Sequence, residues 1–144
     1  MSSFTELLGK ELGPTEWFEV GQERIDEFAR ATDDPQWIHV DPVRAADGPF
    51  GTTVAHGFLT LSLCVPLMSR TLALTGYSMG VNYGVNKVRF PAPVPSGSRI
   101  RAHFTVQSVE EVPGGDQGVV LATVEREGGD KPVCVAELVV RMLR

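Results

Sequence analysis

A chain of 144 residues is the size of one ordinary domain, long enough to bury about two-thirds of its extended surface. Hydrophobic residues make up 42% and charged residues 22%, without a low-complexity tract or repeat, which excludes a disordered or repeat protein. The net charge of −5, with no basic stripe, argues against nucleic acid as a general partner. We expect a single domain over residues 1–144.

The sequence also indicates a compartment. The amino terminus has no basic segment followed by an apolar run, as a secretory signal peptide would have. Cys64 and Cys134 both stand at apolar positions, which predicts two buried free thiols rather than a disulfide or a metal pair. Both features favour a cytoplasmic protein.

The first third of the chain predicts short elements. A turn of helix is expected near residues 4–8, a strand over 15–20 and an amphipathic helix over 22–32. A proline ends this helix, because the residue before a proline avoids the helical conformation. Residues 34–39 therefore read as a loop, and Asp41 caps a brief helix that follows it.

Residues 54–74, VAHGFLTLSLCVPLMSRTLAL, predict the central element of the fold. On a helical wheel their apolar side chains cover the whole circumference, and a soluble helix of this kind must be enclosed. A membrane span is the alternative, but polar residues interrupt the run and a span needs about 20 mostly apolar residues. We expect a buried helix and no membrane insertion.

After Gly76 the hydrophobic period changes from helical to two, which predicts strands over 77–90, 99–109, 118–127 and 131–143. Short turns join the last three, and parallel pairing would need crossover helices that are missing here. The expected architecture is α+β, with a curved antiparallel sheet of roughly five strands around one long helix. The free edge of such a sheet favours a homodimer.

Asp34 and His39 are the first candidates for chemistry, five residues apart, with Trp37 and Ile38 between them as anchors. A carboxylate and an imidazole held together can position a water and move protons in both directions without a cofactor. The structural alternative is an Asp at a helix end and a His bonded to backbone carbonyls.

Gly57 is the second candidate, at the expected start of the central helix. The first amides of a helix have no internal partner and carry the positive end of its dipole, so they can bind an oxyanion. A glycine there lets a ligand approach closely. The alternative is that Gly57 only relieves crowding where the chain enters the core.

The distribution of charge suggests an anionic ligand. From Gly48 to Val109 there is no Asp or Glu, while the window holds five basic residues: Arg70, Lys87, Arg89, Arg99 and Arg101. Such a surface could attract a phosphate-bearing molecule. Alternatively, acids are scarce there because much of the window is core.

Two motifs carry a resemblance to a known family. The run FARATDDPQWIHVD, followed by VAHGFLTLSL, resembles the MaoC-like dehydratase and (R)-specific enoyl-CoA hydratase family, the hydratase branch of the hot-dog fold. Asp34 and His39 match the family's catalytic Asp and His at its spacing. Asp33 stands where Gly is usual and Gln36-Trp37 where Asn-Pro is usual, so Asp33 is an alternative carboxylate. The segment NKVRFPAPVPSGSRIRA also resembles the family's sheet.

The resemblance implies reversible addition of water to a trans-2-enoyl-CoA, giving the (R)-3-hydroxyacyl-CoA, with no metal and no cofactor besides the coenzyme A of the substrate. Asp34 and His39 would hold the water, and which of them is the initial base stays open. The Gly57 amide would bind the thioester oxygen. Ser62 could reach the loop that carries Asp34, or its hydroxyl could instead bond its own helix. Asn86 could face the site.

The resemblance also implies that coenzyme A lies at a subunit boundary, where its phosphates could meet Lys87, Arg89 and Arg101. Two other functions remain open. A hot-dog thioesterase typically has a carboxylate on the central helix or a different loop, and the window from 48 to 109 has no acid. A non-catalytic acyl-CoA-binding subunit would tolerate replacement of Asp34.

Overall fold

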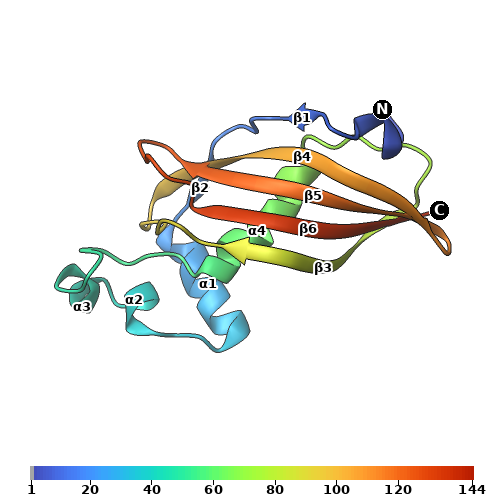
Figure 1. Ribbon diagram of the computed structural model, residues 1–144. Coiled ribbons are helices and arrows are strands. Elements are labelled where there is room, and N and C mark those ends of the chain that lie inside the picture. Colours follow the sequence, from blue (N-terminus) through green and yellow to red (C-terminus); the bar gives the residue numbers. More distant parts are fainter. Residues whose placement is uncertain (1) are drawn as a thin grey trace.

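The computed structural model describes residues 2–144 as a curved antiparallel sheet with α4 against its concave face (Figure 1). In chain order the elements are η1 (Thr5–Leu7), β1 (Glu11–Leu12), β2 (Phe18–Val20), α1 (Gln22–Thr32), α2 (Trp37–Val40), α3 (Pro42–Ala46), α4 (Gly57–Ser69), β3 (Met79–Arg89), β4 (Ser98–Val112), β5 (Gly115–Arg126) and β6 (Cys134–Leu143). The α+β prediction is confirmed, and the fold is a hot-dog fold.

The sheet has six strands in the order β1-β4-β5-β6-β3, and β2 also pairs with β4. All pairs of these strands are antiparallel, and the short connections between β4, β5 and β6 predict this for those three strands. The count exceeds the predicted five because the chain before α1 forms two short strands instead of one. Both lie on β4, at the opposite edge from β3.

Strict alternation builds the inner face of the sheet. Ile100, Ala102, Phe104 and Val106 of β4 are fully buried, and Cys134 and Ala136 of β6 are buried in the same layer. Each large apolar side chain removed from water contributes about 1.5–3 kcal/mol to folding. The hydrophobic period of two that the sequence predicts is therefore confirmed over residues 100–106 of β4 and at the start of β6.

α4 is shorter and less enclosed than the sequence predicts. It spans 13 residues, and Leu72 and Leu74 pack beside the core from the chain that follows it. The sheet covers one side of the helix, while an open stripe is left at the surface by Phe58, Ser62, Pro66 and Ser69. The prediction of complete enclosure was wrong, because the sheet of one chain reaches only part of the way around. Among residues 2–144, none of the helices is long and apolar enough to cross a membrane.

The short helices hold the segment that carries the site, and α1, α2 and α3 gather at one end of the sheet (Figure 1). α1 has the predicted bounds, and the Asp41 carboxylate caps α3 by accepting from the Arg44 amide at 3.0 Å. The predicted loop over 34–39 was partly wrong, since α2 begins at Trp37 and places His39 on a helical turn.

The thiols of Cys64 and Cys134 are both buried and free, as predicted.

Candidate active site

Asp34 is placed by the way α1 ends. Asp33 adopts the left-handed conformation, with φ 57° and ψ 39°, and both its amide and the Asp34 amide donate to the Ala29 carbonyl. Glycine is the usual residue at such a helix end, and Asp is one of the few others that tolerate it. This explains why Asp33 can stand where the resembling family has Gly. Asp33 lines a separate cavity that does not include His39, whereas Asp34 lines the cavity that contains His39.

His39 is buried, with 8% of its surface exposed, and its Nδ1 lies 2.7 Å from the Val54 carbonyl oxygen. A carbonyl can only accept, so Nδ1 carries the proton and the lone pair is on Nε2. Burial lowers the pKa of His39, although the hydrogen bond to Val54 partly opposes this shift. His39 is therefore a neutral imidazole at pH 7, with a free nitrogen that can accept a proton.

His56 is a member of the site that sequence reasoning missed. Its ring stacks on that of His39, with centroids 3.8 Å apart, and its Nε2 donates to the Asp34 backbone carbonyl at 2.9 Å. Its Nδ1 is buried without a hydrogen-bond partner among residues 2–144. His56 directly precedes Gly57 in the motif VAHGFLTLSL, and this adjacency could have indicated that it belongs to the site. Its distance along the sequence from Asp34 and His39 gave no indication that its ring contacts them.

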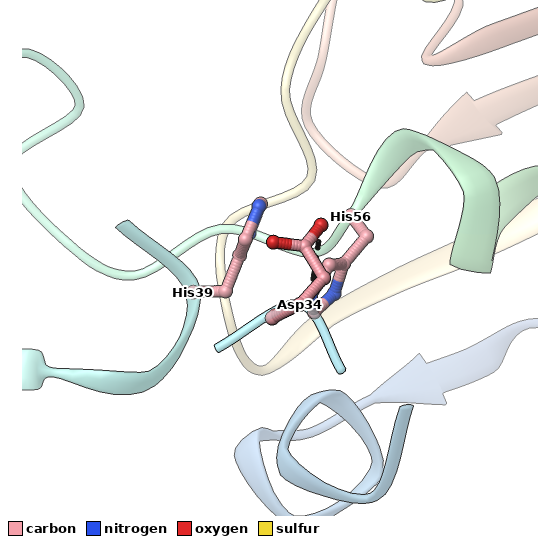
Figure 2. Close-up of side chains that lie close together, drawn as sticks. All are labelled: Asp34, His39 and His56. Carbon is pink, nitrogen blue, oxygen red and sulfur yellow. Dashed lines mark hydrogen bonds and ion pairs between the residues drawn. The ribbon is translucent and has the colours of Figure 1, made fainter. Parts of the chain in front are cut away.

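The three side chains meet in one place (Figure 2). Asp34, His39 and His56 each place one side-chain nitrogen or oxygen atom within 4.8 Å of those of the other two. His56 Nε2 is 3.9 Å from an Asp34 carboxylate oxygen. They line an open cavity of about 400 Å³ together with Phe28, Thr32, Gly57, Phe58 and Phe90. The Asp34 side chain is 53% exposed and both histidines are buried, so the cavity leads from solvent to the buried, neutral imidazole of His39.

Gly57 begins α4 at the wall of this cavity. The amides of Leu59 and Thr60 donate to the His56 carbonyl, while the Gly57 amide has no acceptor within the described chain. A Cβ on Gly57 would lie 2.8 Å from the Phe90 ring. Gly57 and Phe90 also line a second cavity of about 370 Å³, which His39 lines as well. The close approach of Phe90 supports the crowding explanation, and the unpaired amide supports the oxyanion explanation.

The two supporting residues suggested by the sequence lie outside this cavity. The Ser62 hydroxyl donates to the Phe58 carbonyl at 2.8 Å, so it bonds its own helix and does not reach the chain around Asp34. Asn86 is exposed on β3 and lines neither of the two cavities that contain His39.

The three basic candidates have different surroundings. Lys87 and Arg89 are exposed near the end of β3, close in sequence to Phe90, and the Arg89 guanidinium donates to the Val88 carbonyl. Arg101 instead pairs with the Glu125 carboxylate and lies over the Trp17 ring, 4.3 Å from its centroid. Arg101 is thus already neutralised, and it lines neither cavity around His39.

Asp34, His39 and His56 are also a combination of residue types that can bind a metal ion. An imidazole binds a metal along the lone pair in its own plane, at about 2.0–2.1 Å. The planes of the two stacked rings are only 21° apart, so their lone pairs cannot converge on one ion. The ring geometry therefore disfavours a metal ion shared by the two histidines.

Comparison with known proteins identifies the family. A family model described as the MaoC like domain matches residues 3–135. The chain belongs to the MaoC-like family. A curated relative of this MaoC-like chain, the 3-hydroxyacyl-thioester dehydratase Z of Mycobacterium tuberculosis, is 53% identical over 92% of this chain and 89% of its own length. The protein is therefore an enzyme of the hydratase and dehydratase class.

Solved structures agree on the fold. An R-hydratase from Pseudomonas aeruginosa has a TM-score of 0.78 and 22% identity, and the match covers 99% of this MaoC-like chain and 86% of that chain. An (R)-hydratase from A. caviae, described as involved in PHA biosynthesis, has a TM-score of 0.76 and 24% identity over 92% and 94% of the two chains. These likenesses confirm the hot-dog architecture.

Proposed function

We propose that this MaoC-like protein is an (R)-specific enoyl-CoA hydratase, which adds water reversibly to a trans-2-enoyl-CoA to give the (R)-3-hydroxyacyl-CoA. The observation that carries the proposal is the meeting of Asp34, the free Nε2 of His39 and the unpaired Gly57 amide at one cavity. Addition of water to an enoyl thioester requires a proton acceptor, a second group that holds the water, and a hydrogen-bond donor to the developing oxyanion.

The proposed reaction starts with a water held by Asp34 and His39. His39 Nε2 accepts one proton as the water oxygen forms its bond to C3 of the substrate, and Asp34 accepts the second hydrogen bond of the water. The electron pair of the double bond moves to the thioester oxygen, which accepts a hydrogen bond from the Gly57 amide. Asp34 and His39 then return the proton to C2 of the substrate. Both the hydroxyl and the hydrogen of the water have then been added, and His39 is neutral again.

The Gly57 amide would supply much of the rate. An oxyanion donor acts on charge that develops only in the transition state, and losing one typically costs about 2.7–4 kcal/mol. The amide is supported in this role by its place at the positive end of the α4 dipole. No metal or cofactor is required in this scheme, because coenzyme A is part of the substrate.

The nucleotide part of coenzyme A would bind near Lys87 and Arg89, whose positive charges are exposed at the end of β3. Both charges are free of an acidic partner within residues 2–144. Phosphate groups form strong charge-assisted hydrogen bonds with such side chains. Arg101 is a weaker candidate, because Glu125 already pairs with it.

We also propose a homodimer that assembles through β3, in the cytoplasm. β3 is the last strand at its edge, and its exposed apolar side chains include Val81 at 38% and Val85 at 42%. An edge with unpaired backbone groups and apolar side chains favours pairing with a second copy. The buried free thiols of Cys64 and Cys134 suit a reducing compartment.

The test of the reaction compares neighbouring carboxylates. Asp34→Asn and His39→Gln should each reduce hydration of trans-2-butenoyl-CoA by about 10²–10⁴-fold, measured as loss of the conjugated-thioester absorbance. Asp33→Asn is the matched control and should keep activity, because Asn also tolerates the left-handed conformation. Circular dichroism would check that the variants fold. Unchanged turnover in both Asp34→Asn and His39→Gln would contradict the mechanism, and release of free thiol instead of water addition would indicate a thioesterase.

A further inference from the structure

Gln22, the first residue of α1, makes three hydrogen bonds with its side-chain amide. Nε2 donates to the Asp26 carboxylate at 2.8 Å and to the His39 backbone carbonyl at 2.7 Å. Oε1 accepts from the Thr53 hydroxyl at 2.6 Å. The acceptors lie 4 and 17 residues away, and the donor 31 residues away, so one side chain joins three separate parts of the chain.

These partners fix the orientation of the Gln22 amide. If the amide were turned over, its oxygen would face the Asp26 carboxylate and the His39 carbonyl, which are both acceptors. The observed orientation uses both protons of the amide nitrogen. Thr53 is only 2% exposed, so its hydroxyl has little water to replace Gln22 as a partner.

The two long-range bonds hold both ends of the hydrogen bond that orients the His39 ring. One acts on the backbone of His39 itself, and the other acts on Thr53, which precedes Val54. The Val54 carbonyl accepts from His39 Nδ1 at 2.7 Å, and the Val54 amide donates to the Ile38 carbonyl at 3.0 Å. A shift of either segment would therefore loosen the bond that keeps the lone pair on Nε2.

His39 needs this support because α2 is too short to be rigid alone. A helix of four residues has a single turn, and isolated helices are marginal even at about 12–15 residues. The other hydrogen bonds between α2 and a distant segment, within residues 2–144, both involve Val54: its amide donates to the Ile38 carbonyl, and its carbonyl accepts from His39 Nδ1. Gln22 is the side chain whose hydrogen bond connects α2 to α1, which is longer and packs into the core through Ile25.

We propose that Gln22 and Thr53 are positioning residues that keep His39 in the Nδ1-protonated form with Nε2 toward the cavity. This inference rests on the proposed hydration reaction for its effect on rate. Its effect on the His39 ring is independent of any substrate. A displacement of a reacting group by about 1 Å can reduce turnover by about 100-fold, so a loosened His39 has a measurable cost.

The experiment uses substitutions that keep size and change polarity. Thr53→Val removes the hydroxyl and keeps the shape, while Thr53→Ser keeps the hydroxyl. Gln22→Met removes all three hydrogen bonds and keeps the length of the side chain. Gln107→Met, at an exposed position of β4, is the matched control. Hydration of trans-2-butenoyl-CoA gives kcat and KM, and nitrogen-15 NMR of the imidazole rings gives the tautomer of His39.

Thr53→Val and Gln22→Met should lower kcat by about 10- to 100-fold, with KM changed by less than about threefold. The NMR spectrum of both should show a new fraction of His39 protonated on Nε2. Thr53→Ser and Gln107→Met should resemble the wild type in both measurements. A Thr53→Ser loss as large as that of Thr53→Val would show that packing is responsible and would overturn the proposal.

The two proposals fail in different ways. A wild-type protein that does not hydrate the substrate contradicts the proposed function, while the His39 tautomer still tests the role of Gln22 and Thr53. An active wild type with an unchanged His39 tautomer and kcat in Thr53→Val and Gln22→Met overturns the positioning role alone. If Gln22→Met does not fold, the comparison of Thr53→Val with Thr53→Ser decides the matter.

Discussion

The imidazole rings of His39 and His56 stack with their centroids 3.8 Å apart and their planes at 21°. Two rings at this separation cannot both carry a positive charge without strong repulsion. Burial lowers the pKa of His39 most, the bond to Val54 raises it, and the neighbouring His56 lowers it further. The stack therefore helps to keep His39 neutral, which is the form that can accept a proton from water.

The pH dependence of stability should report this shift. The pKa of His39 in the folded protein lies below the value of 6.5 that applies to the unfolded chain. Below pH 6.5 the unfolded state therefore binds more protons than the folded state. The stability that a neutral His39 contributes is present above that pH and is lost as pH falls toward its folded pKa.

Urea unfolding of the wild type and of His39→Gln, at pH 7.5 and pH 5.5, measures this contribution. The wild type should lose more of its free energy of unfolding between these two pH values than the variant does. Groups distant from His39 affect both proteins equally, so the difference between the two belongs to His39 and its interactions with His56 and Asp34. Equal losses would mean that His39 is not held neutral by the fold.

Gly57→Ala separates the two explanations of the glycine. The new Cβ would come within 2.8 Å of the Phe90 ring, so Phe90 must move and stability should fall. The methyl group also stands beside the amide, and kcat for hydration should fall about 10-fold or more. Adding Phe90→Ala removes the clash, and we expect it to restore thermal stability without restoring kcat.

The control for that test is Phe90→Ala alone, which gives the cost of losing the ring from both cavities. If the double variant recovered the kcat of Phe90→Ala, Gly57 would serve only to relieve crowding with Phe90. The oxyanion role of its amide would then be rejected. Differential scanning fluorimetry and the enoyl-CoA absorbance assay give the two readouts.

The sequence predicted the elements whose pattern is local. The bounds of α1, the Asp41 cap of α3 and the alternation of β4 depend on residues within a few positions of each other, and each was confirmed. The position of Asp34 just after α1 was also predictable, because the residue before a proline avoids the helical conformation. Periodicity and turn chemistry carry this information in the residues themselves.

Contacts between distant segments could not be predicted in this way. His56 meets Asp34 across 22 residues, and Gln22 meets Thr53 across 31, with no pattern in the residues between them. The open side of α4 was missed for a related reason. Hydropathy shows which residues avoid water, but it does not show how far the sheet of one chain extends around the helix.

The charges near β3 give a test of coenzyme A binding. Lys87→Ala and Arg89→Ala should each raise KM for an enoyl-CoA by about fivefold, the effect of roughly 1 kcal/mol for one exposed charge-assisted bond. A truncated thioester without the nucleotide should show no such change. Arg101→Ala should affect neither substrate, because the Arg101 charge is paired with Glu125. Equal effects of Arg89→Ala on both substrates would reject a phosphate contact.

The edge of β3 gives the last prediction. We expect the wild type to sediment as a dimer and Val81→Lys or Val85→Lys to shift it toward the monomer, because each places a charge among exposed apolar residues of an unpaired edge. Gln107→Lys, at an exposed position of β4, is the matched control and should remain dimeric. A monomeric wild type would exclude the homodimer, and dimeric valine variants would place the interface elsewhere. If coenzyme A lies at the subunit boundary, the monomeric variants should also show a raised KM for the CoA ester, since Lys87 and Arg89 lie on the same strand.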